Sequence, residues 1–213
     1  MLSLLDLLYP PKCIFCGCDV GKDTYLCEKC RKDAPFYKNS KTKLQFLDSY
    51  TAVWYYKGYV RESLLCYKFH YGLYLIEPYS RFLAARIRQQ YPDGLDLLTW
   101  VPTSPLRSLR RGYDQCHLLA QAVGRELGVR PVRLLKKIRH NPAQSGLAGA
   151  AARRANVVGA YAVLKKDRIQ GKRILLLDDI LTTGATAGEC ARMLKTAGVA
   201  EVHCAVVAAT SKD

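Results

Sequence analysis

The stretch from Arg173 to Thr186, RILLLDDILTTGAT, constrains the fold more than any other part of this 213-residue chain. Ile174 to Leu177 form an unbroken apolar run, which is typical of a strand buried on both faces of a parallel sheet. Two carboxylates follow, Asp178 and Asp179, and then small residues that lead into a helical pattern. The stretch therefore predicts a buried strand that delivers two acids to the edge of a sheet, close to a helix start.

The loop after the acids has the composition of a phosphate site. Its residues are Thr182, Thr183, Gly184, Ala185 and Thr186. Their N–H groups and hydroxyls can bind one phosphate, and the helix dipole favours an anion there. The acids would repel phosphate, so they suit the hydroxyls of a sugar, or a metal. Together these features indicate a ribose 5-phosphate. The alternative is an ordinary strand–turn–helix with polar turn residues.

This arrangement resembles the phosphoribosyl pyrophosphate (PRPP) signature of type I phosphoribosyltransferases. That signature has four aliphatic residues, two acids, two more residues and a Thr/Gly phosphate loop. Further strands are predicted at 49–56, 95–101, 132–136 and 202–208, and helical patterns lie between them. The predicted fold is therefore α/β, with an open, mostly parallel sheet whose ligands bind beyond the carboxyl ends of the strands.

Four of the nine cysteines lie in the spacing of a zinc site. Cys13 and Cys16 form one C-x2-C pair, Cys27 and Cys30 form the other, and four thiolates give the tetrahedral shell that Zn2+ prefers. Cys18 forms a C-x-C with Cys16 and is left out of the predicted set as the less regular ligand. The alternative is free or disulfide-bonded cysteines.

The cysteine segment also predicts the domain organisation. A segment of about 40 residues buries too little core to fold alone, so the metal would supply the folding energy. Residues 1–40 are therefore predicted to be a structural zinc-binding module and residues 41–213 the α/β domain. Leu2 to Leu8 have the spacing of a short amphipathic helix that would pack the module onto the larger domain.

The chain is strongly basic, with a formal net charge of +15. Residues 101–173 contain sixteen Lys/Arg and only three Asp/Glu. Such a field attracts polyanions, either nucleic acid or a sugar that carries pyrophosphate; a solvated basic surface is the alternative. No stretch of about 20 apolar residues predicts a membrane span. The cysteines are in metal spacing or scattered, which favours a cytoplasmic location over a secreted one.

A second candidate loop follows the strand at 95–101. It begins with Thr103 and Ser104 and continues with Arg107, Arg110 and Arg111, of which the last two are preferred as phosphate ligands. Arginine offers fork-shaped donors to phosphate oxygens, so this loop suits a leaving pyrophosphate. The alternative is a surface loop that Asp114 joins to the next helix as its N-cap.

Two further basic residues are candidate substrate ligands. Lys68 ends a predicted helix at 59–69, in the context YKFHYG, where a surface lysine is the alternative. Arg139 begins the Gly/Ala-rich segment 139–154, which is predicted to be a lid that closes over substrate. A disordered surface loop is the equal alternative for that segment.

The cysteine module, the segment VPTSPLRSLRRGYDQ, the loop LLLDDILTTGAT and the stretch RHNPAQSGLAGAARRANVVGAY together resemble the ComF family of phosphoribosyltransferase-like proteins. The resemblance implies a pyrophosphate loop at Thr103 and Ser104, and ribose and 5′-phosphate sites at the acid pair and the Thr-rich loop. Ala185 stands where many type I transferases have glycine, which fits the ComF variant. The implied ligand is PRPP with Mg2+, and Asp178, Asp179, Arg110 and Arg111 are the implied catalytic groups.

The ComF resemblance also implies a role in natural competence, the uptake of single-stranded DNA into the cytoplasm. Its implied partners are single-stranded DNA and a DNA-translocating helicase, and it leaves peripheral membrane association open. Three functions are therefore considered: a phosphoribosyltransferase of unknown acceptor, a non-catalytic PRPP sensor, and a transformation factor that contacts single-stranded DNA. The sequence identifies no general base. The aromatic residues concentrate at 50–79, apart from the basic segment, which weakens a pure DNA-groove interpretation.

Overall fold

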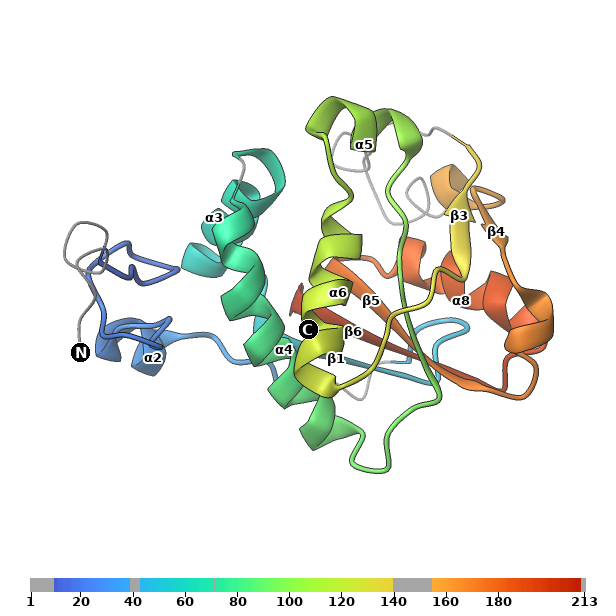
Figure 1. Ribbon diagram of the computed structural model, residues 1–213, viewed down its shortest axis with the longest axis horizontal. Helices are drawn as coiled ribbons and strands as arrows, with labels where there is room; N and C mark the ends of the chain where they lie inside the picture. Colours follow the sequence, from blue (N-terminus) through green and yellow to red (C-terminus); the bar gives the residue numbers. More distant parts are fainter. Residues whose placement is uncertain (1–9, 39–42, 71, 140–154, 212–213) are drawn as a thin grey trace.

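The computed structural model describes residues 10–38, 43–70, 72–139 and 155–211 (Figure 1). In chain order, their helices and strands are α2 (Glu28–Asp33), β1 (Ser49–Tyr55), α3 (Gly58–Phe69), the 3-10 turn η1 (Leu73–Leu75), α4 (Ile76–Gln90), β2 (Leu97–Trp100), α5 (Pro105–Arg111), α6 (Gln115–Leu127), β3 (Leu135–Lys137), β4 (Tyr161–Val163), the 3-10 turn η3 (Lys166–Arg168), β5 (Arg173–Leu181), α8 (Ala185–Thr196) and β6 (Glu201–Ala209).

A four-stranded, wholly parallel sheet forms the centre of the fold, with the strand order β1-β6-β5-β2. Leu177 of β5 lies opposite Ala205 of β6 on one side and Trp100 of β2 on the other. The strand that carries the two acids is therefore an inner strand. The predicted open parallel α/β sheet is confirmed.

Helices cover both faces of the sheet. Helices α4 and α6 pack against each other and against one face, where Figure 1 shows them side by side. Helix α8 packs on β5, β6 and the short strand β4. The chain thus has three layers, and the carboxyl ends of all four strands point to one edge.

The aliphatic run of β5 explains why this strand is central. Ile174, Leu175, Leu176 and Leu177 are all fully buried. Leu175 and Leu177 belong to the apolar cluster that includes α4 and α6 residues, whereas Ile174 and Leu176 belong to the cluster that includes α8 residues. Each such side chain contributes about 1.5–3 kcal/mol on burial. The predicted burial on both faces is confirmed.

The region between α6 and β5 differs in detail from the prediction. A strand was expected at 132–136, but β3 is Leu135–Lys137. It pairs antiparallel with β4, Lys136 lying opposite Ala162, and together they form a ribbon separate from the main sheet. Residues 140–154, which make up nearly all of the predicted lid, lie outside the described residues.

The amino-terminal segment is attached to the outer edge of β1. The N–H of Tyr37 donates to the carbonyl of Val53 at 2.9 Å, and that of Tyr55 donates to the carbonyl of Pro35 at 2.7 Å. Trp54 between them is fully buried. The Phe15 ring packs edge-on against Trp54 at 5.3 Å between ring centroids. The cysteine segment therefore packs directly on the sheet.

Two predictions about the amino-terminal part concern residues outside the described range. The domain boundary predicted at residue 40 falls within residues 39–42, and the predicted helix at Leu2 to Leu8 falls within residues 1–9. Within the described ranges, every helix is too short or too polar to cross a bilayer.

Candidate functional site

The two acids of β5 lie near the carboxyl end of the strand and have different surroundings. Asp179 forms an ion pair with Lys68, the second-last residue of α3, at 2.9 Å between Nζ and Oδ1. The side chains of Lys68 and Asp179 are only 25% and 10% exposed. Asp178 is less buried than Asp179, and its Oδ1 accepts the backbone N–H of Asp179 at 2.9 Å. Lys68, a candidate from the sequence, is thus brought to the acid pair.

Burial and mutual repulsion perturb both acids and the lysine. Burial and the Asp179 carboxylate raise the pKa of Asp178 to about 7, although Lys68 opposes the shift. Burial alone would lower the pKa of Lys68, but Asp179 and Asp178 together raise that pKa above its ordinary value. Lys68 is therefore charged, and Asp178 carries an unfavourable negative charge that a hydroxyl donor or a cation would stabilise.

Cys116, in the first turn of α6, is a third group at this point. Its thiol donates to Asp178 Oδ1 at 3.5 Å, and the ligand atoms of Cys116, Asp178 and Asp179 lie within 4.8 Å of one another. Burial raises the pKa of Cys116 well above its ordinary range, so the thiol is neutral. Because Lys68 already neutralises Asp179, the side chains here fit a protein-held divalent ion poorly.

The predicted phosphate loop joins β5 to α8. Gly184 is the N-cap of α8 with φ +79°, and a Cβ there would lie 3.0 Å from the Leu44 side chain. Thr183 Oγ1 accepts the N–H of Ala185 at 3.3 Å, and Thr210 Oγ1 donates to the carbonyl of Thr182 at 3.1 Å. The backbone and Leu44 therefore require glycine at position 184. Two of the predicted loop residues, Ala185 and Thr186, form the first turn of α8.

The segment after β2 is fixed by Asp114. Thr103 donates to this carboxylate with its backbone N–H and its hydroxyl, each at 3.2 Å, and Ser104 beside it is buried. Asp114 also accepts the N–H of His117 at 3.2 Å, which confirms it as the N-cap of α6.

The arginine-rich loop predicted after Ser104 is wrong in its conformation. Residues 105–111 form helix α5, in which Pro105 occupies the first position. Proline is favoured there, because the first helical N–H has no intrahelical partner and the φ of proline suits the helix. The side chains of Arg107 and Arg110 lie outside the described part of the structure, so only their position on this short helix is known.

Arg111 is brought to the same edge by contacts that join α3 to α6. Its Nη1 donates to Gln115 Oε1 at 2.6 Å, and its guanidinium lies over the Phe69 ring at 5.3 Å. Gln115 Nε2 in turn donates to the carbonyl of Tyr67, whose hydroxyl donates to the carbonyl of Gln115 at 2.8 Å. Because Tyr67, Lys68 and Phe69 are consecutive, these bonds position Lys68 and Arg111 together.

Arg139 is placed differently from the other candidates. It lies just after β3, and its Nη1 donates to the carbonyl of Val158 at 3.3 Å. Within the described residues, no contact joins it to the acid pair.

The sequence analysis did not identify Gln115, Cys116 or Tyr67 as site residues. The position of Gln115 one residue after the N-cap and four after Arg111 was a usable signal, because residues four apart can meet on a helix surface. The contacts of Cys116 and Tyr67 depend on tertiary packing.

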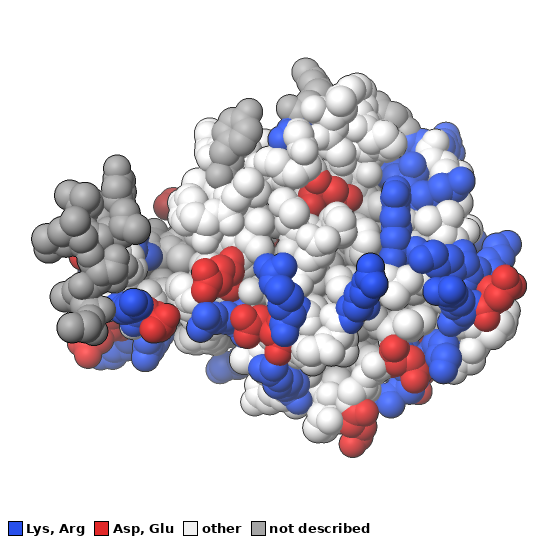
Figure 2. All heavy atoms as spheres, viewed as in Figure 1, with Lys and Arg blue, Asp and Glu red and all other residues white. Residues whose placement is uncertain are grey.

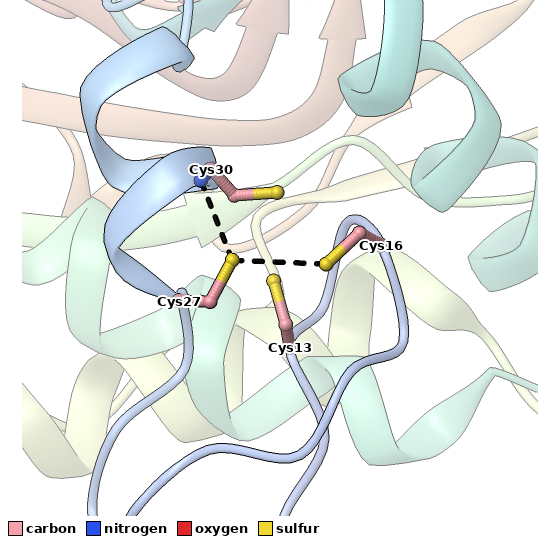
Figure 3. Close-up of side chains that lie close together, drawn as sticks. All are labelled: Cys13, Cys16, Cys27 and Cys30. Atoms are coloured by element: carbon pink, nitrogen blue, oxygen red, sulfur yellow. Dashed lines mark hydrogen bonds between the residues drawn. The ribbon is translucent and has the colours of Figure 1, made fainter.

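The four cysteines of the predicted zinc site converge (Figure 3). The Sγ atoms of Cys13, Cys16, Cys27 and Cys30 lie within 4.8 Å of one another. The sulfurs of Cys16 and Cys27 are 3.7 Å apart, close to the separation of about 3.8 Å that two thiolates have on a tetrahedral zinc with Zn–S of about 2.3 Å. Cys27 caps α2 by accepting the N–H of Cys30 at 3.4 Å. The residues therefore fit a structural Zn2+.

Local hydrogen bonds favour the thiolate form at two of the four cysteines. Hydrogen bonds from the backbone and the thiol of Cys18 lower the pKa of Cys16 to about 6. The backbone N–H of Cys30 lowers the pKa of Cys27. Burial raises the pKa of Cys30, so the thiolate form, which binds metal, is favoured at Cys16 and Cys27, whereas the metal would have to displace the proton of Cys30.

Comparison with known families gives two matches. The family described as "Phosphoribosyl transferase domain" matches residues 114–213, which include the acids, the phosphate loop and α8. The family described as "Double zinc ribbon domain" matches residues 4–41, which include the four cysteines.

Three curated relatives of this chain have names that refer to competence or to DNA utilization. The chain is 26% identical to competence protein F of Haemophilus influenzae, over 91% of this chain and 82% of that protein. It is 27% identical to competence protein ComFC of Streptococcus pneumoniae, over 94% and 89% of the two chains. It is 31% identical to DNA utilization protein YhgH of Salmonella typhi, over 51% of this chain and 47% of that protein. With its parallel sheet and four-cysteine cluster, the chain is similar over nearly its whole length to ComFC-type phosphoribosyltransferase-like proteins, and its amino-terminal segment matches a zinc-binding family.

Proposed function

We propose that this protein binds PRPP with Mg2+ and serves the uptake of single-stranded DNA during natural competence. The observation that carries the proposal is the meeting of three features at one sheet edge. Asp178 carries a negative charge that Lys68 compensates only in part, Gly184 is the N-cap of α8 a few residues away, and Lys68 lies beside the acids. A sugar that carries phosphate at both ends needs this combination of groups.

Each group has a separate role in the proposed complex. The loop at Gly184 binds the 5-phosphate, through the N–H groups and dipole of the α8 N-terminus. Asp178 accepts hydrogen bonds from the ribose hydroxyls, and Lys68 and Arg111 face the pyrophosphate. Mg2+, bound with the pyrophosphate, would supply charge neutralisation. Arg110, Thr103 and Ser104 lie on the segment after β2 that would close the pyrophosphate end.

Transfer of the ribosyl group to an acceptor is a further step of this proposal. The described side chains at the edge supply charge stabilisation for a departing pyrophosphate, but we assign the role of general base to none of them. Pyrophosphate release with a panel of bases and amines tests the step. Release with any member supports a transferase, whereas binding without release supports a PRPP sensor.

PRPP with Mg2+ is expected to stabilise the wild-type protein in a thermal melt. Saturation to 100 times the dissociation constant contributes about 2.7 kcal/mol, which raises the melting temperature of a chain of this size by about 5–10 °C. Ribose 5-phosphate should give a smaller shift, because it lacks the groups that Lys68 and Arg111 would bind. Absence of any shift with PRPP would refute the proposed site.

Asp178→Asn provides a control that distinguishes lost binding from lost folding. The raised pKa of Asp178 means that the folded protein binds this proton more tightly than the unfolded chain, so stability falls as the pH rises from the ordinary pKa of an aspartate to about 7 and levels off above that. The amide removes that cost, and at pH 8 we expect a gain of at least about 1.4 kcal/mol, the equivalent of one pKa unit. The variant should therefore melt higher than wild type and yet lose the PRPP shift.

The basic surface supports a second candidate function, direct contact with single-stranded DNA. Exposed basic side chains flank the β3–β4 ribbon, where Figure 2 shows Lys and Arg gathering on one side of the molecule. They include Arg133, Lys136, Arg139, Lys165, Lys166 and Arg168, with Asp167 as an acidic neighbour. A DNA-translocating helicase as partner and a cytoplasmic location would accompany this function.

Affinity for single-stranded DNA is expected to depend steeply on salt. Contacts to about six phosphates would lower the affinity by about 10²- to 10³-fold between 50 and 200 mM salt. Replacing Arg133, Lys136 and Lys165 by alanine should weaken binding and flatten the salt dependence, as fluorescence anisotropy would measure. Lys29→Ala with Lys32→Ala, on the exposed side of α2, is the matched control. Tight binding that ignores salt would contradict this function.

A further inference from the structure

The cysteine cluster has a fifth sulfur within reach. Cys18 Sγ lies 3.3 Å from Cys16 Sγ, which is closer than the 3.7 Å between Cys16 and Cys27. A structural zinc ion takes four ligands in a tetrahedron. If Cys13, Cys27 and Cys30 occupy three positions, two neighbouring thiols are available for the fourth.

The backbone, and not only a flexible side chain, places Cys18 at the cluster. The N–H of Cys13 donates to the carbonyl of Cys18 at 2.8 Å, and the N–H of Gly17 donates to the carbonyl of Cys13 at 2.9 Å. Gly17 has φ +74°, which lets the chain reverse between the two cysteines. A bridge between Lys12 and Asp19 continues the pairing. Cys18 therefore faces Cys13 across a tight turn.

The cluster has a buried side and an exposed side. Cys13 and Cys30 are buried, Cys27 is half-buried, and Cys16 and Cys18 are both exposed. Two thiolates on one tetrahedral zinc lie about 3.8 Å apart, so Cys16 and Cys18 at 3.3 Å are too close to serve as adjacent ligands without moving. As they stand, only one of these two sulfurs can bind the ion at a time. The buried sulfurs have no such alternative among the described cysteines.

We propose that Cys18 is an alternative zinc ligand that exchanges with Cys16 at the solvent-facing position of the site. In the exchange, one zinc–sulfur bond breaks and another forms, the incoming thiol releases its proton, and the outgoing thiolate takes one up. No electrons are transferred. The site would thus hold its metal through either of two exposed thiolates. Cys13, Cys27 and Cys30 would be the three constant ligands.

Single and double serine variants of the full chain, kept reduced, test this exchange. Wild type, Cys16→Ser and Cys18→Ser are each expected to hold one zinc per chain, with affinities in a chelator competition that agree within about tenfold. Cys27→Ser and the double variant Cys16→Ser with Cys18→Ser should each lose more zinc affinity than this. Removal of an outer-shell partner alone costs about 10–100-fold in metal affinity, and the loss here should exceed that range. Cys66→Ser, a half-buried cysteine elsewhere, is the control and should match wild type.

Cobalt(II) in place of zinc gives a second readout, because its thiolate charge-transfer absorbance scales with the number of bound sulfurs. Cys16→Ser should keep the four-thiolate intensity, and the double variant should fall to the three-thiolate value. If Cys16→Ser loses zinc as completely as Cys27→Ser does, the proposed exchange is wrong, although the proposed zinc site still stands. Retention of four-thiolate absorbance by the double variant also overturns it. A wild-type chain without zinc overturns both the exchange and the site.

Discussion

Replacing Cys30 by serine is expected to release zinc and unfold the cysteine module while the parallel sheet stays folded. Between residues 10 and 38 the described structure contains one six-residue helix, α2, so this segment has little regular structure of its own. Structural zinc contributes about 10–16 kcal/mol in comparable peptides. Phe15 would leave Trp54, whose indole is fully buried and packs 4.9 Å from the Phe82 ring on its other side.

Tryptophan fluorescence measures this release. Trp54 and Trp100 are the two tryptophans of the chain, so a Trp100→Phe background leaves Trp54 as the reporter. Its emission should move to longer wavelength in Cys30→Ser and on addition of a chelator to wild type. Cys190→Ala, at a buried cysteine outside the cluster, is the control and should leave the emission unchanged. An unshifted emission in a zinc-free protein would show that the module folds without metal.

Replacing Lys68 by methionine is expected to destabilise the fold by about 3–5 kcal/mol, the usual cost of removing one partner of a buried ion pair. The change leaves Asp179 buried at 10% side-chain exposure with Asp178 as its neighbour and no described cation beside it. Two neighbouring carboxylates then lack a buried counter-charge, so ionising both of them costs free energy in the folded variant. The variant should therefore lose stability as the pH rises, and resemble wild type more closely at pH 5 than at pH 8.

Denaturant unfolding at the two pH values measures this effect. Lys68→Met combined with Asp179→Asn should recover most of the loss, because the uncompensated charge is gone. Lys12→Met removes one partner of an exposed pair, in which Lys12 and Asp19 are 56% and 63% exposed, and should change stability by less than about 1 kcal/mol. Equal effects of Lys12→Met and Lys68→Met would mean that burial of the Lys68 pair has no energetic consequence.

Local sequence patterns were sufficient for the strand and the cysteine cluster. The run from Ile174 to Leu177 has no polar position, so only a strand with two covered faces could accommodate it. The two C-x2-C pairs needed only their spacing. The helix start at Ser104 and Pro105 was also present in the sequence, yet the nearby arginines led us to expect a loop where α5 forms.

Other parts of the candidate site depend on packing between distant segments. The pairing of Lys68 with Asp179 joins α3 to β5, and the sequence contains no local trace of it. The different surroundings of the two neighbouring acids arise because Asp179 meets Lys68 of α3, whereas Asp178 meets Cys116 of α6. Gln115 becomes a connector only because the end of α3 is brought against the start of α6. Such contacts follow from the strand order, which periodicity alone does not specify.

The pairing of residues 35–37 along β1 has a consequence for solubility. An uncovered edge strand is a template onto which a second copy of a chain can add its own strand. If the cysteine module loosens, β1 loses the neighbour that blocks the addition of another strand. The backbone edge of β1 and its apolar residues are then exposed to other protein molecules. Loss of zinc would then first appear as aggregation of the protein, before any loss of ligand binding at the acid pair.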